Sequence, residues 1–238
     1  MGVATSGLRA ATNNGAQALA KVAADTGIQL RIVNGDEEAL LGYKAVEGEY
    51  REKYGTQSHI VVWDIGGGSM QFATRALNSV TDADFIVRSL PVGGTSFLDQ
   101  LIAKTKRNEG ATLSPISNGE IFNSIFDARS LSAGVPKAIR DILLFDKNVQ
   151  VIGVGGLHCE GINQSVSKTP EYTLDQVIEL RWLLAGRDLD WIKANYTNTT
   201  YPTHLAASAI LVSGMMEALG IRKVRVMDVN LTDGLMRD

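Results

Sequence analysis

Cysteine and proline are scarce in this sequence of 238 residues, which contains one cysteine and five prolines. The single cysteine, Cys159, excludes an intrachain disulfide framework and a zinc site built from cysteines. No run reaches the roughly 18 apolar residues of a membrane span, so no membrane interaction is expected. Residues 1–6 carry neither the basic nor the apolar region of a secretory signal, so we expect a cytoplasmic protein.

An excess of positive charge is also missing. The chain has 23 Lys and Arg against 26 Asp and Glu, which gives a formal net charge of −3. A general basic surface for wrapping nucleic acid is therefore excluded. Hydrophobic residues make up 45% of the chain and charged residues 21%, which favours a sizeable core in one large domain or two small ones.

Glycine, in contrast, is abundant and clustered. The chain has 24 glycines, with groups at 66–68, 93–94 and 153–156, each directly after an apolar run. A strand followed by a glycine turn, and then by a strand or helix, is typical of phosphate-binding α/β proteins.

Residue patterns predict helices and strands along the whole chain. An alanine-rich segment with Asn14 as its N-cap predicts a helix over 14–26 that ends at Gly27. Apolar and β-branched runs predict the strands, and capping residues mark the helices that follow. The further expected strands are 28–33, 58–63, 69–74, 85–90, 149–154 and 223–229, and the expected helices are 36–54, several within 95–145, 173–184, 187–193, 202–219 and one starting at 233.

The order of these elements predicts the fold class. From residue 58 onward it is β-β-β-α, then β-α, then β-α, with three closely spaced strands that form an antiparallel meander. We expect an α/β, ribonuclease-H-like lobe with a mixed five-stranded sheet, three strands antiparallel and two more parallel. Residues 1–57 contain only helix, strand and helix. They are therefore expected to be the incomplete C-terminal remnant of a second such lobe, beside a complete lobe at 58–238.

The most specific motif is Val-Val-Trp-Asp-Ile-Gly-Gly-Gly-Ser at 61–69. A strand delivers Asp64 to a turn without side chains, here called the glycine turn (residues 66–69), where backbone N–H groups can approach an anion. Asp64 could hold Mg²⁺ opposite the phosphates, and Ser69 adds a hydroxyl donor. An ordinary β-hairpin is the alternative, but three consecutive glycines exceed what a hairpin needs.

Two further motifs are ambiguous on their own. The acidic segment 33–39 opens the predicted helix, where acids ordinarily interact with the helix dipole and only sometimes act in catalysis. Segment 3–13 brings small hydroxyl residues close to Arg9, which could bind phosphate or simply form a surface loop.

The last motif is Gly-Val-Gly-Gly-Leu-His at 153–158. The dinucleotide fingerprint fails because His158 stands where its third glycine belongs, although a turn for another phosphate remains open. The P-loop and Gly-x-Ser-x-Gly patterns are absent. His59, His158 and His204 show no ligand spacing, so they are expected to be structural, and Cys159 is expected to be a small buried apolar residue.

Taken together, the motifs at 4–13, 35–39, 64–69 and 153–156 resemble those of the exopolyphosphatase / guanosine pentaphosphate phosphohydrolase (Ppx/GppA) family. This family belongs to the actin-like ATPase superfamily, in which the glycine–aspartate turn is widespread. The arginine segment and the Gly-x-Glu-Glu-Ala segment narrow the resemblance to this family, and it extends over essentially the whole chain.

The resemblance implies two lobes around a cleft, with Mg²⁺-dependent hydrolysis of the terminal phosphoanhydride of polyphosphate or guanosine pentaphosphate. It implies that Glu38 is the catalytic base or water-orienting group and that Arg9 faces the cleft. Asp64 matches the metal-linked aspartate, with Gln71 as a second metal position. A homodimer is also expected. The phosphate-binding residues implied are Thr5, Ser6, Gly66, Gly67, Gly68, Ser69, Gly155 and Gly156.

Three departures from the family pattern qualify this expectation. The family has another glycine–aspartate turn before the arginine segment, and it is absent here. Without it, a lone chain is expected to aggregate, to pair with a missing piece or to be inactive. Gln71 stands where the family usually has Glu, and a neutral Gln binds Mg²⁺ less well and cannot act as a base. Leu157 replaces a small hydroxyl residue.

These departures leave a rival reading open: a phosphate or nucleotide sensor that keeps the glycine turn without turnover. A sugar or acetate kinase lobe is a weaker reading, because those proteins lack the Gly-x-Glu-Glu-Ala segment.

Overall fold

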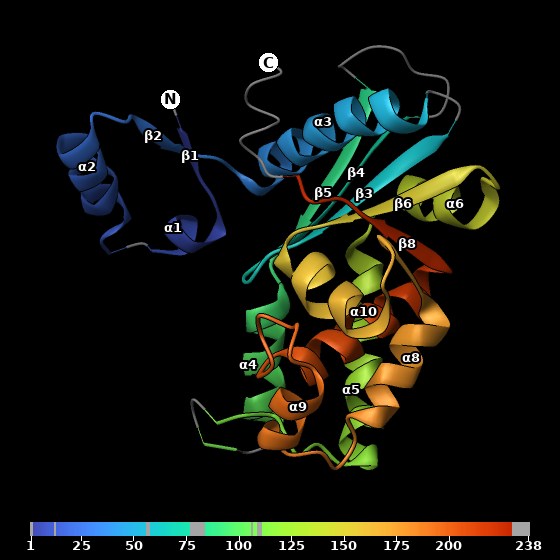
Figure 1. Ribbon diagram of the computed structural model, residues 1–238. Coiled ribbons are helices and arrows are strands. Elements are labelled where there is room, and N and C mark those ends of the chain that lie inside the picture. The colour runs from blue at the N-terminus through green and yellow to red at the C-terminus, as the bar shows by residue number, and fades with distance from the viewer. Residues whose placement is uncertain are drawn as a thin grey trace.

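The computed structural model describes residues 2–229 apart from 12, 56–57, 77–83, 106 and 109–110, so the helix expected from 233 lies outside the described residues (Figure 1). The elements in chain order are β1 (Gly2–Ala4), α1 (Ser6–Ala10), α2 (Gly15–Thr26), β2 (Leu30–Ile32), α3 (Gly35–Tyr54), β3 (His59–Ile65), β4 (Met70–Arg75), β5 (Phe85–Leu90), α4 (Gly94–Lys104), α5 (Asn118–Ser130), α6 (Lys137–Phe145), β6 (Val149–Val154), the π-helix η3 (Leu157–Asn163), α7 (Gln164–Val166), β7 (Glu171–Thr173), α8 (Leu174–Leu183), α9 (Leu189–Asn195), α10 (Leu205–Leu219) and β8 (Lys223–Val226).

The central sheet has the strand order β5-β4-β3-β6-β8-β7. Strands β3, β4 and β5 pair antiparallel as a meander, while β6 pairs parallel to β3 and β8 parallel to β6. The predicted ribonuclease-H-like order is therefore confirmed. The sheet has six strands rather than the five expected, because the short strand β7 pairs antiparallel to β8 at the edge.

The two faces of this sheet are covered unequally (Figure 1). On one face, helix α3 packs on β3, β4 and β5 through a layer that includes Tyr43 and Val46. On the other face, helices that include α4, α5, α8 and α10 bury Trp63 and Phe72 in the larger core. Helix α10 is buried nearly all round, as predicted. None of the helices in the described part of the chain has the length and hydrophobicity that a membrane span requires.

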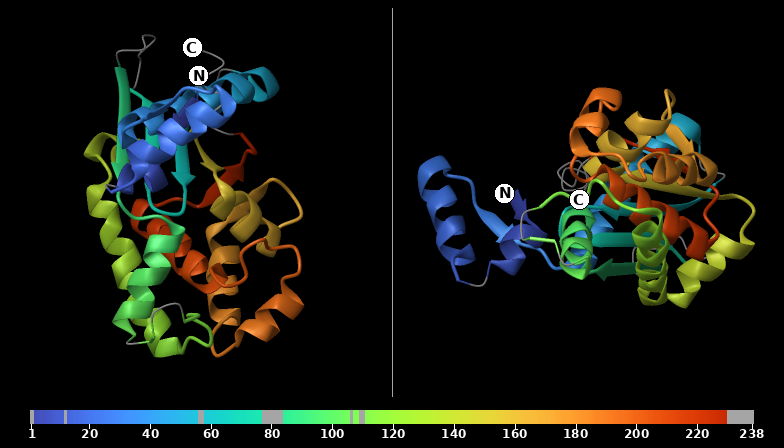
Figure 2. Two further views of the ribbon diagram at one scale, coloured as in Figure 1. Left: turned by 90° about the vertical axis from the view of Figure 1, so that its left-hand side faces the viewer. Right: turned by 90° about the horizontal axis from the view of Figure 1, so that it is seen from below.

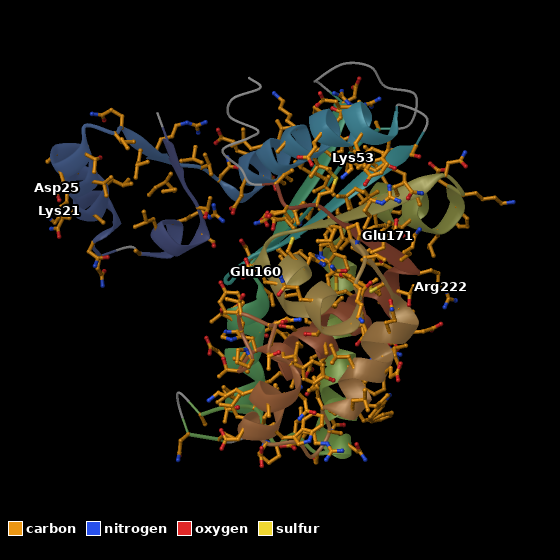
Figure 3. All side chains as sticks on the ribbon, viewed as in Figure 1. Lys21, Asp25, Lys53, Glu160, Glu171 and Arg222 are labelled. Carbon is orange, nitrogen blue, oxygen red and sulfur yellow. The ribbon has the colours of Figure 1, made fainter. Side chains whose placement is uncertain are left out.

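The N-terminal residues form a smaller unit beside this sheet (Figure 2). Strands β1 and β2 pair in parallel, with α1 and α2 as the crossover between them. The ion pair of Lys21 with Asp25 lies on the side of α2 that faces away from the larger unit (Figure 3).

The predicted division at residue 57 needs correction, because α3 buries its apolar side on the six-stranded sheet. The smaller unit therefore ends near Asn34, before α3 begins.

Candidate active site

Three polar side chains lie in a row where the apolar layer under α3 ends. In the strand register, Asp64 pairs with Gln71, and Gln71 pairs with Ser89. Since side chains alternate along a strand, Asp64 shares the α3 face of β3 with Ile60 and Val62. We call Asp64, Gln71 and Ser89 the polar row.

The first turn of α3 lies over this row. Asn34 caps the helix, with its Oδ1 accepting from the backbone N–H of Glu37 at 2.8 Å. The carboxylate of Asp36 accepts a hydrogen bond from the backbone N–H of Ser89 at 3.2 Å. This bond joins the start of α3 to the end of β5, so the helix cannot slide along the sheet without breaking it.

The two residues predicted to be catalytic are brought together. Arg9 Nη2 lies 3.0 Å from Oε2 of Glu38, and Arg9 Nη1 donates to the carbonyl of Val33 at 2.6 Å. Glu38 is only 7% exposed, so its carboxylate is held in place by an arginine that reaches it from the smaller unit. Neither residue is near the other in sequence, and the contact depends on the way the chain returns through β2.

The glycine turn presents donors rather than acceptors. The carbonyl of Gly66 accepts from the N–H of Gly94 at 2.8 Å, and the carbonyl of Gly67 accepts from the N–H of Thr95 at 2.9 Å. The N-terminus of α4 therefore engages these carbonyls. Within the described residues, the N–H groups of residues 67–69 donate to no acceptor, which is the arrangement that an anion can complete.

Some of these groups line a polar cavity of about 490 Å³ between the smaller unit and the sheet, but the predicted Glu38, Asp64 and Gln71 are not among its lining residues. The cavity contains Arg9 and Ser6 on one side and Ser69 on the other, whereas the predicted Thr5 does not line it. Arg88 and Ser89 were not predicted, because only the register of β5 brings them here. The lining residues are Ser6, Arg9, Asn34, Gly35, Asp36, Gly68, Ser69, Arg88, Ser89 and Pro91.

Asp64 and Glu38 influence each other. Burial and, to a smaller extent, the negative charge of Glu38 together raise the pKa of Asp64 to about 6. Arg9 pairs with Glu38, whereas Asp64 has no ion pair within the described residues, so a divalent metal ion beside Asp64 would supply the missing positive charge. The described residues contain no group of three or more His, Cys, Asp or Glu side chains that could enclose a metal. Mg²⁺, however, is usually held by one or two carboxylates together with water and substrate phosphates.

Gln71, the other predicted metal position, is 2% exposed. Its Nε2 lies 2.8 Å from Oγ of Ser69 and 3.3 Å from Oγ of Ser89, donating to both hydroxyl groups. The amide nitrogen of Gln71 is thus hydrogen-bonded to other side chains of the protein. The role of Gln71 as a metal ligand stays a prediction.

The remaining predicted phosphate residues lie on the far side of the glycine turn. Gly66, Gly67 and Gly156 line a second cavity of about 290 Å³, together with Tyr201. Gly155 lies next to Asp64 and has a φ of +87°, and a Cβ there would come 2.6 Å from the Asp64 carboxylate. The other predicted phosphate residues divide between two cavities that share the glycine turn as a wall, while Thr5 and Gly155 line neither.

His59 and His158 have structural contacts, whereas His204 lines the second cavity. His59 Nδ1 lies 3.1 Å from the carboxylate of Asp146, and the buried His158 Nδ1 lies 2.5 Å from the hydroxyl of Tyr172. Cys159 is partly buried, and burial with nearby carboxylates raises the pKa of its thiol to about 12. The thiol is therefore protonated at neutral pH and unsuited to act as a nucleophile.

Comparison with known proteins supports the resemblance predicted from sequence. Residues 1–112 match the model of the Ppx/GppA phosphatase family. No curated protein sequence matches the chain.

Several solved structures share the fold. A Ppx/GppA family member of Aquifex aeolicus superposes with a TM-score of 0.70 at 17% identity, covering 98% of this chain and 71% of its own. An exopolyphosphatase from Cytophaga hutchinsonii gives 0.67 at 17% identity, covering 99% and 72%. An exopolyphosphatase-like protein gives 0.73 at 16% identity, covering 99% and 76%. At these identities the structures establish the fold, which agrees with the predicted one.

Proposed function

From the match of residues 1–112 to the model of the Ppx/GppA phosphatase family, we propose that the protein is a Mg²⁺-dependent hydrolase. Its substrate is inorganic polyphosphate or guanosine pentaphosphate, from which it releases the terminal phosphate. One observation carries the proposal: Arg9, which pairs with Glu38, lines the same cavity as Gly68 and Ser69 of the glycine turn.

Different groups of the protein have different roles in phosphoryl transfer. This reaction needs alignment and neutralisation of charge more than covalent help. The N–H groups of residues 67–69 bind the oxygens of the terminal phosphoryl group, and Arg9 supplies a full positive charge. Glu38 lies beside Arg9 at the other wall, where its carboxylate orients a water molecule for attack and accepts its proton.

Asp64 would hold the metal ion, directly or through water. A bound Mg²⁺ would neutralise charge that develops on the phosphate oxygens. The carboxylate of Asp64 carries no ion pair within the described residues, and its pKa is already raised, so a cation nearby would favour its charged form.

A sensor without turnover is the second candidate, and one observation favours it. Glu38 is engaged by Arg9 at 3.0 Å, so its carboxylate is occupied by an ion pair and is less free to orient a water molecule. In that case the site would bind phosphate groups and release none.

The decisive experiment follows phosphate release from long-chain polyphosphate and from guanosine pentaphosphate, each with Mg²⁺. We expect release by the wild-type protein, and we expect Glu38→Gln to lower turnover about 10²–10⁴-fold, the usual contribution of general base catalysis. Glu37→Gln is the matched control, because Glu37 pairs with Arg31 outside the polar cavity and should keep wild-type turnover.

Binding of either substrate without release would support the sensor. A Glu38→Gln variant as fast as wild type would remove Glu38 from the mechanism.

A further inference from the structure

The polar cavity contains two hydroxyl groups whose hydrogens are unused. Ser69 is 4% exposed, and both Ser69 and Ser89 line the cavity. Each hydroxyl oxygen accepts a hydrogen bond from Gln71, and within the described residues neither hydroxyl donates to an acceptor. A buried hydroxyl without an acceptor costs free energy, so the buried Ser69 above all, and the half-buried Ser89 beside it, favour a ligand that accepts hydrogen bonds.

Gln71 determines which way these hydroxyls can point. Its amide nitrogen donates two hydrogens, one to Ser69 at 2.8 Å and one to Ser89 at 3.3 Å. A hydroxyl that accepts from one direction has its own hydrogen free for another direction. Because Gln71 is 2% exposed and paired with both Asp64 and Ser89 across the strands, it cannot turn away easily.

We propose that Gln71 is a positioning residue that presents the hydroxyl hydrogens of Ser69 and Ser89 to a phosphate group in the polar cavity. This inference rests on the proposed function only in taking phosphate as the ligand. With the three N–H groups of the glycine turn, the two hydroxyls form a continuous set of donors along one wall. These donors favour an oxyanion, and the carboxylate of Asp36, which also lines the cavity, accepts from the N–H of Ser89.

The neutral amide also fits the charge of the site better than an acid would. A glutamate at position 71 would accept hydrogens from both hydroxyls and so turn them away from the ligand. It would also add a third carboxylate beside Asp64 and Glu38, whose charges already interact. Both effects weaken phosphate binding.

The test measures binding of inorganic phosphate by titration calorimetry in buffer with EDTA, so that no metal contributes. The variants are Gln71→Met, Gln71→Glu, Ser69→Ala with Ser89→Ala, and Gln71→Met in that double-alanine background. Gln100→Met is the matched control, since Gln100 is exposed on α4 away from the cavity. Circular dichroism melts confirm that each variant is folded.

We expect Gln71→Met to weaken phosphate binding about tenfold, the size of a lost hydrogen bond to a charged ligand. Gln71→Glu should weaken it more, and Gln100→Met should not change it. In the double-alanine background, Gln71→Met should change binding by about twofold or less, because the groups that it positions are gone.

An equal loss from Gln71→Met in both backgrounds would overturn the proposal. So would a Gln71→Glu variant that binds phosphate more tightly than the wild-type protein when Mg²⁺ replaces EDTA, since that result identifies position 71 as a metal ligand. Wild-type protein that binds phosphate with the expected coupling but releases none from polyphosphate would refute the hydrolase and leave this inference standing. No phosphate binding by the wild-type protein, either in EDTA or with Mg²⁺, would overturn both.

Discussion

Asp64 is the side chain on which burial and neighbouring charge act together. Its pKa is raised from 3.8 to about 6, first by burial and then by Glu38. Between these two values the folded chain binds more protons than the unfolded chain, so stability falls as pH rises through this interval. Above pH 7 the charged carboxylate costs about 3 kcal/mol, at 1.36 kcal/mol for each pKa unit.

We therefore predict that Asp64→Asn raises the free energy of unfolding by about 1–3 kcal/mol at pH 8 and by little near pH 4. Thermal melts in EDTA at the two pH values measure this, with the exposed Asp190→Asn as control. A stabilisation of the same size at both pH values would show that the charge of Asp64 is not responsible.

Sequence reasoning found some of these side chains and missed others for a physical reason. Glu38, Arg9 and Asp64 stand in recognisable motifs, and the structure brings them to one site. Ser89 stands in no motif. It joins the site only because β5 pairs with β4 in the register that places it beside Gln71, and register is a tertiary property.

The length of a strand determines whether the sequence predicts it. Strands β3, β4, β5 and β6 carry six or seven residues with apolar or β-branched patterns, and each was predicted within about two residues of its observed bounds. Strand β7 has three residues, too few to show a period, and it exists because Tyr172 pairs with Val224 of β8.

The turn after β6 packs closely against Asp64 and so holds this side chain in position. Gly155 has a φ of +87°, and a Cβ there would lie 2.6 Å from Oδ1 of Asp64 and 2.8 Å from the carbonyl oxygen of Ile65. Gly186 has a similar φ of +69°, yet nothing lies within 4 Å of its Cβ position. A substitution at Gly186 therefore measures the cost of the left-handed backbone alone, and a substitution at Gly155 measures that cost together with the cost of the steric contact.

We predict that Gly186→Ala destabilises the fold by about 1–2 kcal/mol, the cost of the left-handed conformation alone. Gly155→Ala should cost about 2–5 kcal/mol, because displacement of Asp64 adds to the same strain. Urea unfolding of both variants measures the difference. Equal losses would mean that the contact with Asp64 is relieved without cost.

The molecule as a whole consists of two units of unequal stability. The larger unit has a six-stranded sheet with helices on both faces. The smaller unit has a two-stranded parallel sheet, in which Ile28, just before β2, and Ile32 are 50% and 40% exposed. Two strands with so little covered surface are marginally stable by themselves.

Hydrogen exchange measured by mass spectrometry should therefore show faster exchange in α2 and β2 than in β3 and β4. Bound phosphate should slow exchange around Arg9, because the ligand contacts both units at the polar cavity. Equal protection of the two units without ligand would contradict this view of their stability.

The arrangement of the site is tested most directly by a crystal structure of the protein with inorganic phosphate and Mg²⁺. We expect phosphate oxygens about 2.9 Å from the N–H groups of residues 67–69. Arg9 should contact the same phosphate, and the Glu38 carboxylate should face it across the cavity. A phosphate bound elsewhere, or a Glu38 carboxylate turned away from the glycine turn, would contradict the account.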